Sequence, residues 1–437
     1  MTAPERRLYV ETYGCQMNAA ESEALVADLA NDGWRLVDGP AEADLVVINT
    51  CSVRETAEER IRGRLGWYRR EKRSRQFALL LTGCMAQRLG ERALEEFPAL
   101  DAVVGTGGSE TIREAVRRMS DGERPVVRGH GEFRFAARHS RGSLRAFVPV
   151  MHGCDNFCSY CIVPYVRGRE VSRPVADVIA EVRAIESDGC QDVTLLGQNV
   201  NSYRREIDGS TVTFPALLKT VAAAAGRIRW IRFLTSHPKD FSPELVAVMA
   251  EEPRLCRHVH LPVQSGSDRV LAAMNRGTTA DGYLRLVDAI RRALTGVSIT
   301  TDILTGFPGE TEEDLRRTLE LMERAQFEEA FTYRYNPREG TSAALLDDTV
   351  PDAVKLDRLD RIIDAQRRIT LRRARERLGT VTEVLVEGIS RRDEGELLAR
   401  TEWDAMAVVP GDPSLIGRFV RVRLASLSGA TFRATVL

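Results

Sequence analysis

The sequence predicts an α/β protein with three successive domains. These are a parallel-sheet α/β domain at residues 1–135, a partial (β/α)6 TIM-like barrel at 136–372 and a small antiparallel β-barrel at 373–437. Three observations support this fold class. Apolar strand-like runs alternate with helical patterns in the first region, alternate again in the second, and give way to short alternating strands in the third. A chain of 437 residues is long enough for about three domains.

In the first domain we expect strands at residues 6–14, 43–50, 77–83 and 101–107, with helices at 21–33, 53–65 and 86–97. This alternation implies βαβ units and a parallel sheet. Cys15, Cys51 and Cys84 each follow one of the first three strands. Because the turns after parallel strands gather at one edge of a sheet, these three thiols can meet there. Three buried or incidental cysteines are the alternative interpretation.

The second domain has six predicted strands, at residues 147–153, 192–198, 227–236, 258–266, 297–310 and 328–335. Helices between them indicate an incomplete TIM-like barrel, whose active site lies at the C-terminal ends of the strands. Residues 355–378 form a predicted amphipathic helix that leads to the last domain. There, strands at 381–389, 395–403, 405–411, 417–427 and 431–437 predict a small barrel of OB-like size.

Composition excludes little by itself, because 62 basic and 63 acidic residues nearly cancel. Two arginine-rich runs, 60–75 and 367–377, are either solvated helix faces or contacts to a phosphate backbone. The chain starts without an apolar signal segment, and none of its apolar runs approaches a membrane span. We therefore expect a cytoplasmic protein that does not bind membranes. In a reducing compartment, its eight cysteines are ligands or core thiols, and Cys190 and Cys256 are expected in the core.

Three further cysteines, Cys154, Cys158 and Cys161, follow the first strand of the second domain on one short loop. A 4Fe-4S cluster has four irons and is usually held by cysteines, so three ligands leave one iron open for a substrate or cofactor. A zinc knuckle would need a second Cys/His pair, and only His152 lies nearby. A disulfide would need an oxidising compartment.

This CxxxCxxC loop resembles that of the radical S-adenosylmethionine (SAM) superfamily. Combined with the three earlier cysteines, it makes the chain similar to the MiaB-type tRNA methylthiotransferases over essentially its whole length. The resemblance implies a methylthiotransferase N-terminal domain, a radical SAM core and a C-terminal TRAM RNA-binding domain. The matching runs are TYGCQMNAAESE, INTCSVRETAEERI, TGCMAQR, FVPVMHGCDNFCSYCIVPYVRGREVSRP, LLGQNVNSY, IRFLTSHP, HLPVQSGSDRVL and DILTGFPGETEED.

The resemblance also implies cofactors and a reaction. Cys154, Cys158 and Cys161 would hold the 4Fe-4S cluster that cleaves SAM to a radical, and Cys15, Cys51 and Cys84 a second 4Fe-4S cluster that carries the sulfur. Two SAM molecules would be used to convert N6-isopentenyl-adenosine beside the tRNA anticodon to its 2-methylthio form. The implied partners are the anticodon stem-loop of tRNA, an electron donor and a sulfur source. We expect a monomer.

Further residues are candidates for contacts to SAM or tRNA. Gly197, Gln198 and Asn199 match the second SAM motif of the superfamily, whereas Ser236 and Gln264 follow later strands. Such strand-end residues could equally satisfy turn hydrogen bonds. Arg167, shortly after the cysteine loop, could bind the SAM carboxylate or a tRNA phosphate. In the last domain, alternating arginines form either an RNA platform or an ordinary solvated strand face; these are Arg400, Arg418, Arg421 and Arg423.

Three other functions compete with this one. The enzyme could methylthiolate threonylcarbamoyl-adenosine in tRNA, or a ribosomal protein, although TYGCQMN and NTCSVRE favour tRNA. From a different class, the chain could be a non-catalytic iron-sulfur module that binds RNA. The sequence also departs from relatives in the last domain, where Ala399 and Asp404 stand in place of a frequent Gly and Asn.

Overall fold

The computed structural model describes residues 5–52, 55–129, 143–393 and 395–437. The chain divides into two compact units, one made of residues 1–157, 161–189 and 195–198 and the other of the remainder. The domain boundary expected between residues 135 and 136 lies outside the described residues, and that between 372 and 373 falls inside a helix, so the three domain ranges stay a prediction. Within the described ranges, no helix is long and apolar enough to cross a bilayer.

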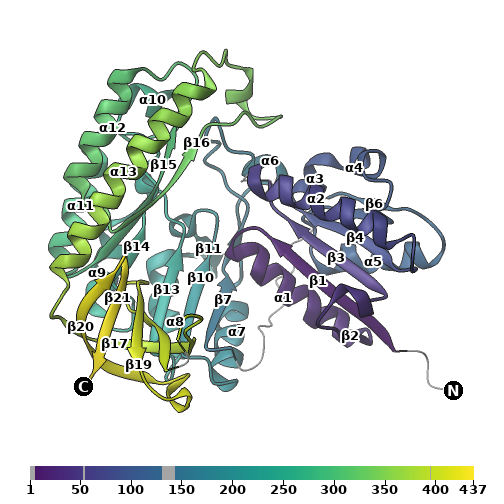
Figure 1. Cartoon of the computed structure of the whole chain (residues 1–437), viewed down its shortest axis with the longest axis horizontal. Coiled ribbons are helices and arrows are strands. Elements are labelled where there is room, and N and C mark those ends of the chain that lie inside the picture. The colour runs from purple at the N-terminus through teal and green to yellow at the C-terminus, as the bar shows by residue number, and fades with distance from the viewer. Residues whose placement is uncertain (1–4, 53–54, 130–142, 394) are drawn as a thin grey trace. The chain divides into compact units, whose positions relative to one another are not determined.

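The first unit contains a six-stranded sheet in the order β2-β1-β3-β4-β5-β6 (Figure 1). All five pairings between neighbouring strands are parallel, as the βαβ pattern predicts. The two edge strands, β2 and β6, were not predicted because they are too short to show a pattern. The strands are β1 (Arg6–Tyr13), β2 (Trp34–Leu36), β3 (Leu45–Thr50), β4 (Ala78–Gly83), β5 (Ala102–Val104) and β6 (Val126–Val127).

Helices cover both faces of this sheet, so every residue of β3 is buried, and so is every residue of β4 after the first. In β3, Val46 and Ile48 belong to the core under α2, α3 and α4, whereas Leu45 and Val47 belong to the core under α1 and α5 (Figure 1). This two-sided burial is typical of parallel sheets. The helices are α1 (Gln16–Asn31), α2 (Glu55–Glu71), α3 (Cys84–Leu89), α4 (Glu91–Glu96) and α5 (Ser109–Ser120).

The rest of the first unit surrounds the cysteine loop. The loop lies between β8 (Met151–His152) and α6 (Val163–Arg167), and β8 pairs antiparallel with β9 (Val171–Ser172). Strand β7 (Arg145–Pro149) precedes it and helix α7 (Val175–Ser187) follows. Strand β10 (Asp192–Leu196) begins in the second unit and ends in the first.

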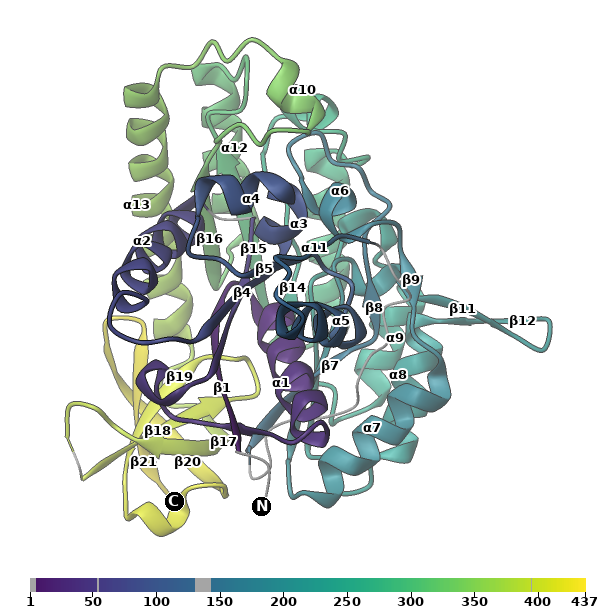
Figure 2. The same ribbon diagram turned by 90° about the vertical axis from the view of Figure 1, so that its right-hand side faces the viewer.

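The second unit continues the strand and helix alternation. Strands β14 (His258–His260), β15 (Ser298–Thr305) and β16 (Glu329–Arg334) form one parallel sheet. Strand β13 (Trp230–Leu234) belongs to a sheet with β10 and β7, and its Ile231 forms an isolated parallel bridge with Leu255, just before β14. With β7 and β10, all six strands expected for the partial barrel form. The helices are α8 (Phe214–Ala224), α9 (Pro243–Glu251), α10 (Asp268–Ala273), α11 (Ala280–Ala293), α12 (Glu312–Ala325) and α13 (Asp352–Glu376). A hairpin that was not predicted, β11 (Arg204–Ile207) and β12 (Ser210–Thr213), extends from this unit (Figure 2).

The C-terminal segment of the second unit is a closed five-stranded barrel in the order β17-β18-β19-β21-β20 (Figure 2). Its strands match the predicted ranges closely because alternate residues point into one apolar core. The pairing is antiparallel except between β19 and β21, which are parallel and close the barrel. The strands are β17 (Val381–Ile389), β18 (Glu396–Thr401), β19 (Met406–Pro410), β20 (Phe419–Ser428) and β21 (Thr431–Val436).

A buried arginine fixes this barrel to the strands of the second unit. Arg232 of β13 is 4% exposed and forms an ion pair with Asp192, with 3.0 Å between Nε and Oδ2. Its other nitrogens donate to the carbonyl oxygens of Thr401 (3.0 Å) and Glu402 (2.8 Å) at the end of β18. The charge is thus satisfied on both sides, as a buried guanidinium requires.

Candidate functional site

Cys15, Cys51 and Cys84 follow three adjacent strands that end level with one another. Tyr13 at the end of β1 pairs with Thr50 at the end of β3, and Thr50 pairs with Gly83 at the end of β4. Cys51 and Cys84 come directly after their strands, and Cys15 comes two residues after Tyr13. The three cysteines therefore leave the same edge of the sheet, the edge at which parallel α/β folds bind ligands.

Two buried asparagines connect the turns that carry Cys15 and Cys51. The Asn18 amide nitrogen donates to the Thr50 carbonyl (3.2 Å), while its Oδ1 lies 3.4 Å from the Cys15 sulfur. In return, Asn49 Nδ2 donates to the Asn18 carbonyl (3.0 Å). Sequence reasoning did not single out either asparagine, although both lie in the TYGCQMN and INTC runs.

Gly83 allows the turn before Cys84 to pack closely against β3. Its φ is +91°, and a Cβ at this position would lie 2.4 Å from the Thr50 carbonyl oxygen. Any side chain would therefore clash as well as strain the backbone. This glycine lets Cys84 begin α3 directly beside the end of β3.

Arg167 and Glu21 lie beside Cys84. The carboxylate of Glu21, on α1, accepts hydrogen bonds from both terminal nitrogens of Arg167, the last residue of α6. Burial raises the pKa of the Cys84 thiol, and the charge of the Arg167 guanidinium acts in the opposite direction. Burial would lower the pKa of Arg167, but Cys84 and Glu21 together raise it well above its ordinary value. Arg167 therefore stays charged, and the structure places that charge on Glu21 and Cys84.

Helix α6 brings the region after the cysteine loop to the early cysteines within the first unit. Ile162 and Val166 pack against Cys84 in one small buried cluster. In addition, Thr106 Oγ1, after β5, donates to the Val166 carbonyl (2.7 Å). Because α6 begins two residues after Cys161, one end of the loop lies against the edge that carries Cys84.

The loop itself is held by backbone contacts. The Cys154 nitrogen donates to the Gly168 carbonyl (3.2 Å). Gly153 has φ +77°, and a Cβ at this position would clash with the Arg169 carbonyl oxygen, only 2.0 Å away. In the second unit, Arg276 Nη1 donates to the Cys158 sulfur at 3.4 Å. Cys154 and Cys158 are buried, whereas Cys161 is partly exposed.

The cysteines and the charges around them are of the kind that holds iron-sulfur clusters. All eight cysteines are free thiols, and cysteine is the usual cluster ligand. Cysteine binds iron as the thiolate, and buried arginines lie close to both sets, since Arg167 follows Val166, which packs on Cys84, and Arg276 donates to the Cys158 sulfur. Over the described ranges, the side chains as they stand form no preassembled group of three or more Cys, His, Asp or Glu around a single metal position. The type of donor and the adjacent charges fit such clusters.

The predicted SAM contacts lie at strand ends, as expected, but differ in how far their polar atoms are engaged. Asn199 is 1% exposed, and its amide is used internally, with Nδ2 donating to Asp240 and Oδ1 accepting from the His237 nitrogen. In contrast, the Oε1 atom of Gln198 and the hydroxyl of Ser236 are buried without a hydrogen-bond partner among the described residues. Gly197 follows β10 directly.

The turns after β13 and β14 are strained. Thr235 has φ +115° and Gln264 has φ +74°, values that are rare for residues with side chains and worst for a β-branched one. Backbone strain of this kind clusters at functional sites. Next to Thr235, burial together with the nearby charges of Arg276 and Lys239 lowers the pKa of His237 to about 2, so this imidazole is neutral. No sequence pattern indicated these conformations.

Much of the basic character that the sequence suggested is used inside the protein. In the first run, Arg64 pairs with Glu11 and Lys72 with Asp101, and in the second, Arg372 pairs with Glu323. In the C-terminal barrel, Arg400 binds Glu387 and Asp404, and Arg423 donates to the Gly379 carbonyl, whereas Arg418 and Arg421 are exposed.

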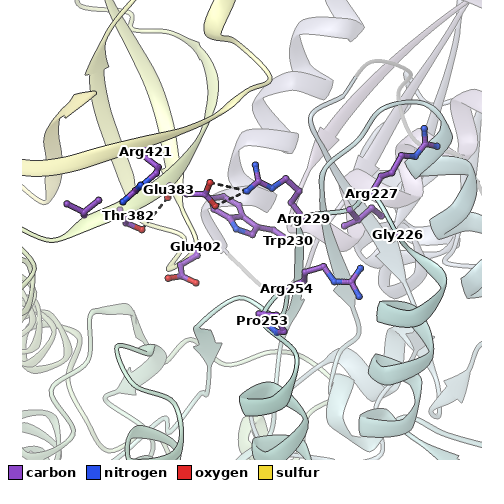
Figure 3. Close-up of a pocket in the computed structure, with 12 residues that line it drawn as sticks. Gly226, Arg227, Arg229, Trp230, Pro253, Arg254, Thr382, Glu383, Glu402 and Arg421 are labelled. Atoms are coloured by element: carbon purple, nitrogen blue, oxygen red, sulfur yellow. Dashed lines mark hydrogen bonds and ion pairs between the residues drawn. The ribbon is translucent and has the colours of Figure 1, made fainter. Parts of the chain in front are cut away.

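Arg421 lines a pocket of about 540 Å³ within the second unit, between the barrel and the segment before β13 (Figure 3). Three more arginines line it, and Arg229 is paired there with Glu383 at 2.8 Å. Glu383 and Glu402 line it as well, so the pocket is open and predominantly polar and suits a polar group rather than an apolar ligand. The other arginines are Arg227, Arg229 and Arg254.

Comparison with known proteins finds a family match for three segments of the chain. Residues 7–105 match the family described as "Uncharacterized protein family UPF0004", residues 148–322 the "Radical SAM superfamily" and residues 375–437 the "TRAM domain". Among solved structures, the radical SAM methyltransferase TsrM from Kitasatospora setae, with cobalamin and a [4Fe-4S] cluster bound, aligns with a TM-score of 0.58 and 16% identity. That alignment covers 78% of this chain and 74% of TsrM, and the likeness concerns the fold alone.

Curated relatives match nearly the whole chain. A protein of Treponema denticola is 45% identical over 98% of this chain and 99% of its own length. A second, from Geobacter metallireducens, is 46% identical over 96% of each chain. Both are named tRNA-2-methylthio-N(6)-dimethylallyladenosine synthase. With the three family matches and the cysteine-bearing strand ends, this similarity shows that the chain is an enzyme that belongs to the radical SAM tRNA-2-methylthio-N(6)-dimethylallyladenosine synthase family.

Proposed function

We propose that this enzyme transfers a methylthio group to carbon 2 of N6-isopentenyl-adenosine next to the tRNA anticodon, with two SAM molecules and two 4Fe-4S clusters. The observation that carries the proposal is the register of Tyr13, Thr50 and Gly83, from which three cysteines leave one sheet edge. A single radical SAM cluster would need only the later three cysteines. The early set therefore supports a second cluster.

When bound, the clusters and SAM supply reductive formation of a 5′-deoxyadenosyl radical and a sulfur that is methylated before transfer. The chain supplies the ligands and their surroundings. Cys154, Cys158 and Cys161 would hold one cluster, and Cys15, Cys51 and Cys84 the other. The packing of Ile162 and Val166 on Cys84 supports a short path between the two sets.

SAM would be bound by strand-end groups. Gln198 Oε1 and the Ser236 hydroxyl are buried polar atoms without a protein partner among the described residues, a state that costs about 1–3 kcal/mol unless a ligand satisfies it. Gly197 and Gln264 would offer backbone groups. Asn199, whose amide is used by Asp240 and His237, would position this loop rather than touch SAM.

For tRNA we propose the C-terminal barrel and the arginine-lined pocket as phosphate contacts, while an unstacked base of the anticodon loop enters the active site. Binding of this kind is mainly electrostatic.

The reaction would also need a one-electron donor and a source of sulfide or persulfide. We further propose that the enzyme acts as a monomer. Light scattering of the anaerobic protein would test the last point.

The decisive experiment uses anaerobically reconstituted enzyme, SAM, a reductant, sulfide and tRNA that carries N6-isopentenyl-adenosine. Nucleosides of the digested tRNA are then identified by mass spectrometry. We expect the 2-methylthio derivative and 5′-deoxyadenosine. If the isopentenyl tRNA is unchanged but tRNA with threonylcarbamoyl-adenosine, or a ribosomal protein, gains the group, the substrate assignment is wrong. Absence of 5′-deoxyadenosine with every substrate would leave only an iron-sulfur RNA-binding module.

A further inference from the structure

A buried ion pair joins α1 to the helix after the cysteine loop. The side chains of Arg167 and Glu21 are only 3% and 15% exposed. They are 146 residues apart in sequence, and both terminal nitrogens of Arg167 contact the two carboxylate oxygens of Glu21, one of them at 3.1 Å. This two-pronged geometry fixes the plane of the guanidinium.

Stability alone does not explain this pair. Removing two charges from water is costly, and apolar residues of similar volume often serve a fold equally well or better. The neighbours of Arg167 on α6, Ile162 and Val166, are apolar and pack on Cys84. An apolar residue at position 167 would extend that cluster. The charged pair is therefore expected to act on a neighbouring group.

That group is Cys84, which is 1% exposed and packs against Val166, the residue before Arg167. An incoming SAM carboxylate or tRNA phosphate would have to displace Glu21 to reach the guanidinium. The geometry thus keeps the Arg167 guanidinium on Glu21, close to Cys84, rather than free for a soluble anion.

We propose that Arg167 and Glu21 are positioning residues that set the charge around the cluster held by Cys15, Cys51 and Cys84. The inference rests on the proposed function, because it needs a cluster at these cysteines. The positive charge of Arg167, at the end of the helix that packs on Cys84, stabilises the more negative, reduced state of the cluster. Glu21 holds the guanidinium in that orientation and offsets part of its charge. At low dielectric, a buried charge this close has a large effect on a redox centre.

The test isolates the second cluster in a variant that lacks the first, Cys154→Ala/Cys158→Ala/Cys161→Ala. Iron and sulfide are measured, and the midpoint potential of the remaining cluster is obtained by dithionite titration followed by electron paramagnetic resonance. In this background we expect Arg167→Gln to lower the midpoint potential, because the cation is lost. Glu21→Gln should raise it, because the cation is no longer offset. Arg167→Lys, which keeps the charge, should lie between Arg167→Gln and the parent.

A matched control is Glu181→Gln. Glu181 forms another buried ion pair of the first unit, with Arg173, and no cysteine is among the groups that shift its pKa. This control should leave the potential unchanged. Shifts of the midpoint potential in opposite directions for the Arg167 and Glu21 variants support the inference. If the pair had only a structural role, both variants would lose cluster, and their potentials would not shift in opposite directions.

Two results overturn the inference, and they are distinguishable. If the background variant holds no iron, the second cluster is absent, and the proposed function fails together with the inference. If iron is normal but the potentials do not move, or move in the same direction, only the inference fails. Should Arg167→Gln lose the cluster, Glu21→Gln decides, since an unchanged or lower potential in that variant contradicts the role proposed here.

Discussion

Asn18 and Asn49 hydrogen-bond to each other in both directions: Asn18 Nδ2 donates to Asn49 Oδ1 (3.1 Å), and Asn49 Nδ2 donates to the Asn18 carbonyl (3.0 Å). Both are almost fully buried, at 0% and 3% exposed. This reciprocal pair ties the start of α1, just after Cys15, to the end of β3, just before Cys51. It therefore sets the spacing of two proposed cluster ligands that are far apart in sequence.

Asn49→Ala should destabilise the protein by about 1–3 kcal/mol, because it leaves buried groups of Asn18 without a partner. We also expect loss of about half the iron, since only one of two clusters depends on this spacing. Gln366→Ala is the control, because Gln366 is a buried amide bonded to the Phe327 carbonyl in the second unit. It should lower stability and leave iron unchanged. Equal iron loss in both variants would contradict the role of the asparagine pair.

The two cysteine sets should fail in different ways. Cys154→Ala should abolish 5′-deoxyadenosine formation, because the SAM-cleaving cluster loses a ligand. Cys84→Ala should retain some SAM cleavage but make no methylthio product. Cys190→Ala tests a core thiol that is bonded to the Asp192 carbonyl and should leave both activities intact. Full product formation by the Cys84 variant would refute its role in sulfur insertion.

Two ion pairs of the second unit should differ greatly in their contribution to stability. Arg232→Ala leaves the buried Asp192 carboxylate unpaired and should cost about 3–5 kcal/mol. Arg229→Ala removes the ion pair with Glu383. Because these two side chains are 44% and 45% exposed, the loss should cost at most about 1 kcal/mol. Urea unfolding followed by far-ultraviolet circular dichroism measures both. Similar losses would mean that Arg232 is not the main link between β13 and the barrel.

Glu11 should contribute to stability in a pH-dependent way. Burial alone would raise its pKa, but hydrogen bonds from Arg64, Tyr68 and Tyr13 lower the pKa below the ordinary 4.5. A lowered pKa means that the contribution is complete above 4.5 and disappears as the pH falls through the folded value.

The comparison is wild type against Glu11→Gln, by urea unfolding of the protein before cluster reconstitution. The difference in unfolding free energy should be constant between about pH 6 and about pH 8 and shrink below about pH 4. A difference that grows on acidification would show that burial, rather than its hydrogen bonds, dominates the pKa of Glu11.

Arg421 should contribute to tRNA binding through a phosphate. Arg421→Ala is expected to weaken binding several-fold at low salt and to reduce the slope of log K against log salt by about one. Arg433→Ala is the control on the same barrel, because Arg433 is paired with Glu396. Filter binding over a salt series measures both. An unchanged slope for the Arg421 variant would exclude the pocket as a phosphate contact.

Much of the fold could be predicted from the sequence because local patterns are strong in this chain. The five strands of the C-terminal barrel and helix α13 lie within a few residues of their predicted ranges, since each alternates or repeats with a clear period. The edge strands β2 and β6 and the hairpin of β11 and β12 were missed. They are short or exposed, so little apolar patterning marks them.

By itself, the sequence determined which strands are followed by a cysteine, and that three more cysteines share one loop. Only the tertiary structure decided what surrounds them. The hydrogen bonds between Asn18 and Asn49, and the ion pair of Arg167 with Glu21, join residues from distant segments. No local pattern encodes such contacts, because they depend on which helices and strands the folded sheet brings together.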